Sequence, residues 1–453
     1  MTFCLVTDQI SPHVLPLAHA LADRLGKGSF RYLVTTGSDA TRRSLGWTTE
    51  SPEWCKIIGP EEVERLAAWQ LIEQADVVLF GNRRHVLLPR RLACGRFTIL
   101  STERWFKPPV GRLRLLHPGY LKMARCCRTW LRNPTFQFLA QGVYAAHDMK
   151  KIGTGLSPSI RLFGYLVDPS VPLPAPKRRQ GVLQILWVGR MLDWKRVDTL
   201  IKAVGRLIHD GRAIHLTLIG QGPEEPRLRA LAARIVGNGS TLGKRRDGGR
   251  ETGDGERETG GGRRGTGDGS PACTARSCDS ALSSSPPDHS PPDHSPLTTH
   301  HSLLDHSPLT THYSPITFLP PVPITEVRAL MRQADVYVLP SSGGEGWGVV
   351  VNEAMLEGCA VIASRETGSG ATLIRDGQNG LLFSSGNVTA LTRALERLEA
   401  DEAFRYQLAT DGQASMLTEW TPTVAAVRLI DFCEARLAGR EPPVWSSGPL
   451  SLA

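Results

Sequence analysis

Hydrophobic residues of this chain recur in short runs of strand length, separated by stretches of helical periodicity. The N-terminal part holds four such runs, "FCLVT", "FRYLVTT", "DVVLF" and "RFTIL". Between the first two lies "SPHVLPLAHALADRL", whose Leu17, Leu21 and Leu25 share one helical face. Its expected N-cap is Ser11, with Pro12 at the first helical position. Strand, helix and strand in alternation predict a parallel α/β sheet.

The same alternation restarts after "PLPAPKRRQG", a Pro-rich and basic stretch from Pro172 to Gly181 that predicts an interdomain linker. Strands and helices then follow in the order "ILWVG", "VDTLIKAVGRLIHD", "HLTLIG" and "GPEEPRLRALAARI", and later "ITFLP", "TEVRALMRQA", "DVYVLP" and "AVIAS". We therefore predict two Rossmann-like α/β domains facing a cleft, because doubly wound sheets bind ligands at the carboxyl ends of their strands.

A low-complexity segment from Gly237 to Pro315 interrupts the second half, with "SPPDH" and "HSPLTTH" repeated almost verbatim. It has hardly any large apolar residues to offset the entropy of ordering, which predicts a disordered insert in a surface loop. Its six histidines lack an ordered scaffold, so we expect no metal site there. The expected organisation is an N-terminal domain at 1–171, a linker at 172–181, a C-terminal domain at 182–440 carrying the insert at 237–315, and a tail at 441–453.

Composition narrows the class of protein. The 453 residues suit about two domains, no apolar run is long enough to cross a bilayer, and the N-terminal residues lack a signal-peptide pattern, so a cytoplasmic protein is expected. Nine scattered cysteines without a CxxC pair indicate neither a disulfide framework nor a zinc site. The formal charge of +9 suits nucleic acid, an anionic membrane or an anionic substrate. No nucleic-acid-binding signature accompanies it, so we expect no nucleic acid partner.

The most informative stretch is "GGEGWGVVVNEAM", in which seven residues separate Glu345 from Glu353. Its three valines favour a strand by propensity, but the turn before them and "NEAMLEG" after them favour the start of a buried helix. Backbone N–H groups at such a start can receive an anion. These donors would belong to Gly346, Trp347, Gly348 and Val349. A fully helical interval would separate the glutamates by roughly 12 Å, which is comparable to the distance between hexose and ribose in a nucleotide sugar.

Two cations follow the strand "ILWVG" in the loop "GRMLDWKRVD". The guanidinium of Arg190 can donate two parallel hydrogen bonds, and the ammonium of Lys195 provides a compact positive charge. Together they suit the binding of a diphosphate. A solvated basic loop is the alternative interpretation.

Four ordered segments, "ILWVGRMLDWKRVDTLIKAV", "LTLIGQGPEEPRLRALA", "ADVYVLPSSGGEGWGVVVNEAMLEGCAVIAS" and "GQNGLLF", resemble the C-terminal domain of family 4 retaining glycosyltransferases, which belong to the glycosyl transferases group 1 and have the GT-B fold. The resemblance runs from about Leu183 to Leu398. It implies that Arg190 and Lys195 bind the donor diphosphate and that Glu353 binds the ribose. It further implies that Glu345 is catalytic, close to the reacting carbon of the donor sugar. The implied donor is a nucleotide-diphosphate sugar, with no cofactor and no metal; cations and a helix dipole would offset the leaving charge instead.

The N-terminal half departs from the family. Many relatives have a glycine pair in the first strand-to-helix loop, where this chain reads "TDQISPHV", and a histidine after a middle strand, where it reads "STERWFKP". The candidates for the acceptor or sugar side are therefore His13, Glu103 and Arg104. Arg196 follows Lys195 where a glycine is usual, which leaves the path of that loop open.

The acceptor side of this fold is the N-terminal domain. Its stretch from Arg90 to Arg132 mixes basic and aromatic residues, which suits an anionic membrane surface and a lipid-linked acceptor; an ordinary basic face is the alternative. The expected function is sugar transfer to a glycan or lipid-linked acceptor in cell-envelope or extracellular polysaccharide biosynthesis, in the cytoplasm or peripherally on the inner face of the membrane. The alternatives are a nucleotide-sugar epimerase or a phosphorylase on the same architecture, or an inactive relative carrying a disruptive insert.

Overall fold

The computed structural model describes residues 1–36, 52–59, 61–81, 87–156, 159–169, 171–178, 180–242 and 314–453. These residues belong to a single compact unit. Most of the insert predicted at 237–315 lies outside the described residues, which stop at 242 and resume at 314.

The N-terminal domain is built on a parallel sheet of seven strands in the order β3-β2-β1-β4-β5-β6-β7. The strands are β1 (Phe3–Thr7), β2 (Phe30–Val34), β3 (Cys55–Ile57), β4 (Val77–Phe80), β5 (Thr98–Thr102), β6 (Phe136–Gln141) and β7 (Ile160–Phe163). The helices of this part are α1 (Leu15–Leu25), α3 (Glu62–Gln74), α4 (Leu87–Ala93), η1 (Gly111–Leu116), α5 (Pro118–Leu131) and α6 (Val143–Ile152).

The C-terminal domain is built on a second parallel sheet, of six strands, in the order β10-β9-β8-β11-β12-β13. The strands are β8 (Leu183–Val188), β9 (Ile214–Ile219), β10 (Ile316–Leu319), β11 (Val336–Leu339), β12 (Ala360–Ser364) and β13 (Leu381–Phe383). The helices are η2 (Asp193–Lys195), α7 (Val197–His209), α8 (Glu225–Leu242), α9 (Ile324–Met331), α10 (Val350–Leu356), α11 (Gly368–Leu373), α12 (Val388–Ala400), α13 (Glu402–Thr418) and α14 (Pro422–Leu437). Two parallel-sheet α/β domains confirm the predicted fold class.

Burial explains why the strands read as continuous apolar runs. All five residues of β1, and all four of β4 and of β11, are buried, because helices cover both faces of a parallel sheet. Helix α7 buries the face on which the sequence placed Val197, Leu200 and Val204. Such amphipathic helices provide the second layer that a sheet needs to exclude water.

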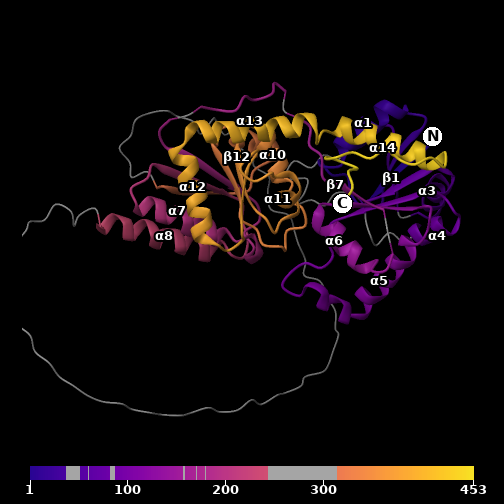
Figure 1. Ribbon diagram of the computed structural model, residues 1–453, viewed down its shortest axis with the longest axis horizontal. Coiled ribbons are helices and arrows are strands. Elements are labelled where there is room, and N and C mark those ends of the chain that lie inside the picture. The colour runs from indigo at the N-terminus through magenta and orange to yellow at the C-terminus, as the bar shows by residue number, and fades with distance from the viewer. Residues whose placement is uncertain are drawn as a thin grey trace, which may run out of the picture. The chain divides into compact units, whose positions relative to one another are not determined.

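The last helix returns to the N-terminal domain. Helix α14 packs against α1, so the yellow end of the chain lies beside its indigo start (Figure 1). Beyond α14, the backbone N–H of Leu162 in β7 donates to the carbonyl of Ser451 at 2.8 Å, which covers the edge of the first sheet. The sequence assigned these residues to the C-terminal domain and a tail, and their packing shows that they also complete the N-terminal core. The remaining domain bounds stay predictions.

Two element ends differ from the prediction. Helix α1 begins at Leu15, with Pro16 in its first turn, and not at Pro12. The carbonyl of Ser11 accepts from Val14 and Leu15 in a preceding turn, while its hydroxyl accepts from the N–H of His13, so Ser11 does not cap the helix. Helix α8 continues to Leu242, past the expected start of the insert at Gly237, because helical hydrogen bonding propagates at little cost once begun.

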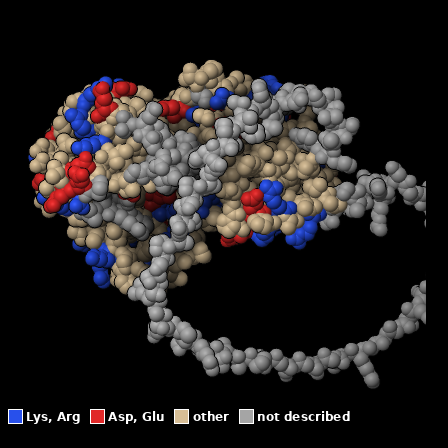
Figure 2. Space-filling model, turned by 180° about the vertical axis from the view of Figure 1, so that it is seen from behind, with Lys and Arg blue, Asp and Glu red and all other residues tan. Residues whose placement is uncertain are grey.

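Charged side chains of both signs are interspersed with uncharged ones on the face that Figure 2 shows, wherever described residues are visible. That face carries no single basic field of the kind that tracks a nucleic acid backbone. Among the described residues, no helix is both long and apolar enough to cross a membrane.

Candidate functional site

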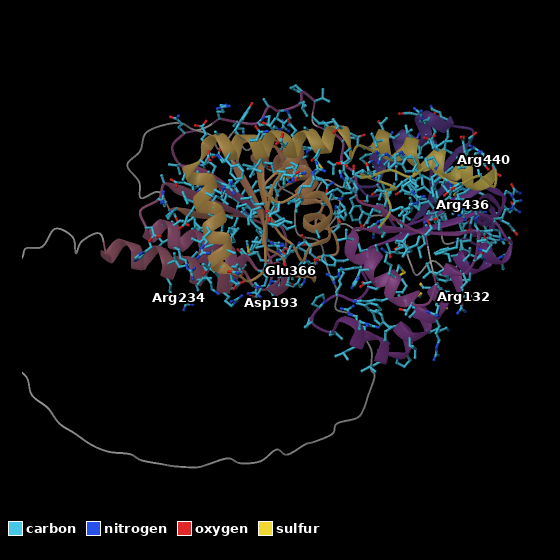
Figure 3. The ribbon with its side chains drawn as sticks, in the orientation of Figure 1. Arg132, Asp193, Arg234, Glu366, Arg436 and Arg440 are labelled. Atoms are coloured by element: carbon cyan, nitrogen blue, oxygen red, sulfur yellow. The ribbon has the colours of Figure 1, made fainter. Side chains whose placement is uncertain are left out.

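Each sheet has a point where the order of its strands reverses. It lies between β1 and β4 in the first sheet and between β8 and β11 in the second. Ligands of open α/β sheets bind at the carboxyl ends of the strands at such points. The loop after β8 carries Arg190 and Lys195, and the loop after β11 carries Glu345, so the topology brings the separate sequence motifs to one sheet edge. Asp193 and Glu366, which follow β8 and β12, lie on the same side of this sheet (Figure 3).

Lys195 and Glu345 form an ion pair at this edge. The Nζ of Lys195 contacts the Oε2 of Glu345, and the hydroxyl of Ser341 donates to the same oxygen at 3.1 Å. Both side chains are mostly buried, which weakens screening by solvent and strengthens the pair. The Lys195 ammonium also lies 4.7 Å from the centre of the Trp194 ring. A cation and a carboxylate are thus held together at the carboxyl edge of the second sheet.

Glu353 is the more deeply buried of the two glutamates, with 3% of its surface exposed. Its Oε1 lies 3.0 Å from the Nε2 of His13, which comes from the loop after β1 in the N-terminal domain. Burial is the main cause that raises the pKa of Tyr337 well above its ordinary value, and the carboxylates of Glu353 and Glu345 add to the rise. Both glutamates therefore lie near this buried tyrosine of β11.

The glycine-rich turn between the glutamates carries four backbone N–H groups in succession. Among the described residues, no acceptor takes a hydrogen bond from the backbone N–H groups of Gly346, Trp347, Gly348 and Val349. Gly348 has a φ of +92°, in the left-handed region that glycine tolerates. The helix predicted here is α10, which begins only at Val350, so the interval between the glutamates is not wholly helical and the 12 Å spacing does not apply.

Trp347 has a role that the sequence did not reveal. Its indole is 1% exposed and its N–H donates to the Oδ1 of Asn352 at 3.0 Å, while the Nδ2 of Asn352 donates to the carbonyl of Tyr165. A methyl group added at Gly164 would lie 2.5 Å from the indole ring. The side chain therefore packs against the N-terminal domain, and only the backbone of Trp347 faces the site. Nothing in the residue pattern indicated that direction.

Glu103, after β5, approaches the glycine-rich turn from the N-terminal domain. A methyl group at Gly346 would collide with the carboxylate of Glu103, which shows how closely this side chain approaches the turn. Lys107 lies 3.3 Å from the carboxylate of Glu103. Burial, followed by the neighbouring Glu103 carboxylate, raises the pKa of Tyr165, and the ring of Tyr165 lies 6.1 Å from that of His13. Two of the N-terminal candidates thus adjoin one tyrosine.

The remaining candidates lie differently. Arg104 places its guanidinium 4.5 Å from the centre of the Tyr144 ring and donates to the carbonyl of Glu366 at 3.4 Å. Burial lowers the pKa of Arg104 from its ordinary value. It therefore joins the two domains. Arg190 is exposed and makes no ion pair with either glutamate, so the structure does not bring it together with Lys195 and Glu345.

Arg196 shows how the loop accommodates the missing glycine. Its backbone adopts φ 53° and ψ 35°, the left-handed conformation that glycine favours, immediately before α7. The guanidinium Nε donates to the carboxylate of Asp198 at 3.3 Å. The loop therefore follows the path that a glycine would allow. Arg196 adopts that conformation in place of glycine, at a cost in free energy.

A cavity of about 370 Å³ opens at the carboxyl edge of the first sheet. His13 and Tyr165 line it, as do Gln9 and Ser101. Among the described residues, the Oε1 of Gln9 and the Oγ of Ser101 are buried without a hydrogen-bond partner. Because buried polar atoms are normally paired, these two indicate a cavity suited to a hydroxylated ligand. No motif in the sequence indicates this cavity, because its polar residues come from separate strand ends.

No group of three or more His, Cys, Asp or Glu side chains within the described ranges is arranged to hold a metal ion.

Comparisons with known proteins show which family the second domain resembles. Residues 183–248 and 314–414 match two family models, both described as glycosyl transferases group 1. The chain is 34% identical over 113 residues to the phosphatidyl-myo-inositol mannosyltransferase of Mycobacterium leprae, a match that covers 25% of this chain and 30% of that relative. It is 31% identical over 96 residues to the lipopolysaccharide core biosynthesis glycosyltransferase LpsE of Rhizobium meliloti, covering 21% of this chain and 28% of that one.

The fold has a close structural match. The crystal structure of Anabaena Alr3699/HepE in complex with UDP superimposes with a TM-score of 0.60 at 13% identity, covering 96% of this chain and all of that one. At this identity the likeness concerns the fold, which is that of GT-B glycosyltransferases. Both parts of the second domain therefore match the glycosyl transferases group 1, over less than half of the chain.

Proposed function

We propose that this protein is a retaining glycosyltransferase of family 4 that moves a sugar from a nucleotide-diphosphate sugar to a glycan or lipid-linked acceptor. The observation that carries the proposal is the grouping of Glu345, Lys195 and Glu353 beside unpaired backbone N–H groups at the switch point of the second sheet. Such a group supplies a carboxylate for hydroxyls at each end and positive charge for a diphosphate between them.

Each residue has a distinct part in the proposed donor site. Lys195 and the N–H groups of Gly346–Val349 receive the diphosphate, with Arg190 reaching it from the loop surface. Glu353 accepts hydrogen bonds from the ribose hydroxyls, and Glu345 lies beside the donor sugar at the reacting carbon. The leaving diphosphate accepts the acceptor's proton, and departure and attack take place on one face of the sugar.

The nucleotide base is the least determined part of the donor. Structures of the fold neighbour HepE hold UDP and UDP-glucose, whereas a relative from Mycolicibacterium smegmatis is named as a GDP-mannose-dependent mannosyltransferase. UDP and GDP sugars are therefore the first donors to test.

The donor site is tested by thermal unfolding of the protein with a panel of nucleotide sugars. A ligand at about 100 times its Kd stabilises the folded state by about 2.7 kcal/mol, so the true donor should raise the Tm measurably. Glu353→Ala is expected to weaken binding by roughly 10-fold or more, because hydrogen bonds to a charged group each contribute about 1.5–3 kcal/mol.

The matched control is His13→Ala, which removes the same contact between the domains but keeps the carboxylate. It should retain the Tm shift produced by the nucleotide diphosphate. If no nucleotide sugar stabilises the wild type, the donor site is wrongly assigned. Equal losses in both variants would mean that Glu353 acts through the domain contact and not on the ribose.

We further propose that transfer needs no metal, since Lys195 and the backbone N–H groups supply the positive charge that the leaving diphosphate requires. Addition of EDTA is expected to leave the initial rate unchanged, and the anomeric configuration of the product, read by NMR, is expected to match that of the donor. A rate that EDTA abolishes and a divalent cation restores would contradict the first expectation, and inversion would contradict the second.

The proposed acceptor site is the cavity in the N-terminal domain that His13, Gln9 and Ser101 line. Its unpaired polar atoms suit the hydroxyls of a sugar. The relatives named for phosphatidylinositol and lipopolysaccharide core synthesis support a role in the cell envelope. We place the protein on the cytoplasmic side of the membrane, where nucleotide sugars and a lipid-linked acceptor meet.

A further inference from the structure

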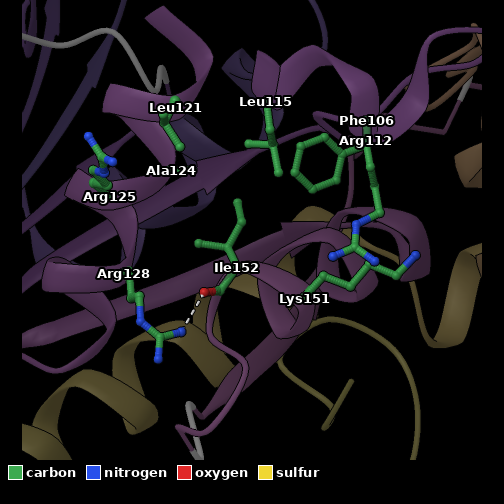
Figure 4. Close-up of a pocket in the computed structure, with 9 residues that line it drawn as sticks. All are labelled: Phe106, Arg112, Leu115, Leu121, Ala124, Arg125, Arg128, Lys151 and Ile152. Atoms are coloured by element: carbon green, nitrogen blue, oxygen red, sulfur yellow. Dashed lines mark hydrogen bonds between the residues drawn. The ribbon is translucent and has the colours of Figure 1, made fainter. Parts of the chain in front are cut away.

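A second, smaller cavity of about 180 Å³ lies in the N-terminal domain between η1, α5 and α6 (Figure 4). Its apolar lining consists of Phe106, Leu115, Leu121, Ala124 and Ile152. Its basic lining consists of Arg112, Arg125, Arg128 and Lys151, and none of the described Asp or Glu residues lines it. The combination is unusual, because an ordinary apolar depression is not lined by four positively charged side chains.

Within the part of the chain that the structure describes, little negative charge balances these cations. Arg112, Arg125 and Lys151 form no ion pair with any carboxylate in the described part of the chain, while Arg128 donates to the carbonyls of Ile152 and Thr154. Figure 4 shows Arg112 and Lys151 beside each other at one end of the cavity, with Arg125 and Arg128 at the other and apolar side chains between. Like charges so placed repel, and an anion at the cavity would relieve that repulsion.

The surface around the cavity is both apolar and basic. Leu113 and Leu116 of η1 are 65% and 82% exposed. From Gly111 to Arg132 the chain contains six Arg and Lys residues and no Asp or Glu. Exposed leucines among cations are typical of segments that lie in a membrane interface. Their grouping on one helix pair distinguishes this surface from scattered exposed residues.

From these contacts we infer that the cavity binds the phosphate of an anionic membrane lipid, with the first carbons of its acyl chains on the apolar floor and Leu113 and Leu116 in the bilayer. Arg112 and Lys151, which lie beside each other at one end of the cavity, bind the phosphate. The cavity is smaller than the 300 Å³ or more typical of sites that enclose a small molecule. It therefore suits partial burial of a lipid that stays in its membrane.

The cavity is linked to the donor site through one loop. Phe106 lines the cavity, and Pro108, two residues later, lies against Gly343 beside the glycine-rich turn. A lipid held here would bring the membrane surface next to the loop that borders both sites. The biological role of this cavity rests on the proposed function, because the cavity would hold the membrane at which the lipid-linked acceptor is bound. Lipid binding itself can be measured without a donor sugar.

The test is co-sedimentation of the full chain with phosphatidylglycerol vesicles, compared with phosphatidylcholine vesicles, at low and physiological salt. The wild type should bind the anionic vesicles. Arg112→Glu with Lys151→Glu should lower the partition coefficient at least about 10-fold, because each basic residue near an anionic surface contributes roughly a fivefold factor. The matched control, Arg234→Glu with Arg440→Glu, changes the net charge equally at two exposed sites elsewhere and should alter binding less than about twofold.

A second pair of variants tests the apolar part. Leu113→Ser with Leu116→Ser should also weaken vesicle binding, without loss of stability, because both side chains are exposed. All variants should keep the Tm shift produced by the nucleotide sugar, which separates this inference from the proposed donor site. Absence of wild-type binding even at low salt overturns the inference, as do equal losses in the two charge variants. Release from vesicles by glycerol 3-phosphate would show that the cavity takes a free phosphate and not a lipid.

Discussion

Glu345→Gln is expected to lower kcat by about 10²-fold or more while leaving donor binding nearly intact. Glutamine keeps the size of the side chain and an oxygen that can accept from Ser341. It removes the negative charge that faces Lys195 and that would lie beside the cationic transition state of the donor sugar. Loss of one preorganised charged group at a reacting centre typically costs 10²–10³ in kcat. The measurement is single-turnover sugar transfer at saturating donor.

The control for this variant is Asp193→Asn, the same carboxylate-to-amide change two residues from Lys195 at the same sheet edge. Asp193 is exposed, and the proposed mechanism does not use it, so its rate should stay within about twofold of the wild type. A Glu345→Gln enzyme with unchanged kcat would remove Glu345 from catalysis. A variant that fails to show the donor-induced Tm shift would instead assign Glu345 to binding.

Trp347→Ala is expected to lower the free energy of unfolding by about 3–5 kcal/mol, the usual loss for a buried tryptophan replaced by alanine. The variant leaves a cavity where the indole contacts Gly164 and Gly142 of the N-terminal domain. It also leaves the Oδ1 of Asn352 without its donor. Urea denaturation, followed by circular dichroism, measures the change.

Trp347→Phe separates the two contributions, because phenylalanine fills most of the cavity but has no N–H to donate. Its loss should be roughly half as large or less. If Trp347→Ala unfolds at the same urea concentration as the wild type, the indole does not join the domains as the structure indicates. Donor binding by the phenylalanine variant should persist, since the proposed donor contacts of Trp347 come from its backbone.

Most of the fold could be predicted from the sequence, because the patterns that mark its strands and helices are local. Each run such as "DVYVLP" or "AVIAS" is buried on both faces, so it reads as continuously apolar wherever it lies in the chain. Helix starts were less accurate. The hydrogen bonds of the turn at Ser11 resemble those of a helix N-cap. Only the structure shows that α1 begins four residues after Ser11.

The candidate site could be predicted from the sequence only in part. Lys195 and Glu345 were predicted to lie at one sheet edge because each follows a strand, and strand ends of a parallel sheet share one edge. Their ion pair shows that they meet there. The pairing of His13 with Glu353 joins residues 340 positions apart and has no local signature. The direction of the Trp347 side chain and the unpaired Gln9 and Ser101 likewise depend on which elements meet in space.

The sequence by itself determined two doubly wound halves, the interruption between α8 and β10, and the family that the second domain resembles. These follow from periodicity and from motifs whose spacing is read along the chain. Only the tertiary structure decided which N-terminal residues approach the two glutamates, that α14 returns to cover α1, and that four cations surround one apolar cavity. The physical reason is that such contacts join distant segments, and their geometry is set by the packing of whole elements and not by the residues that flank them.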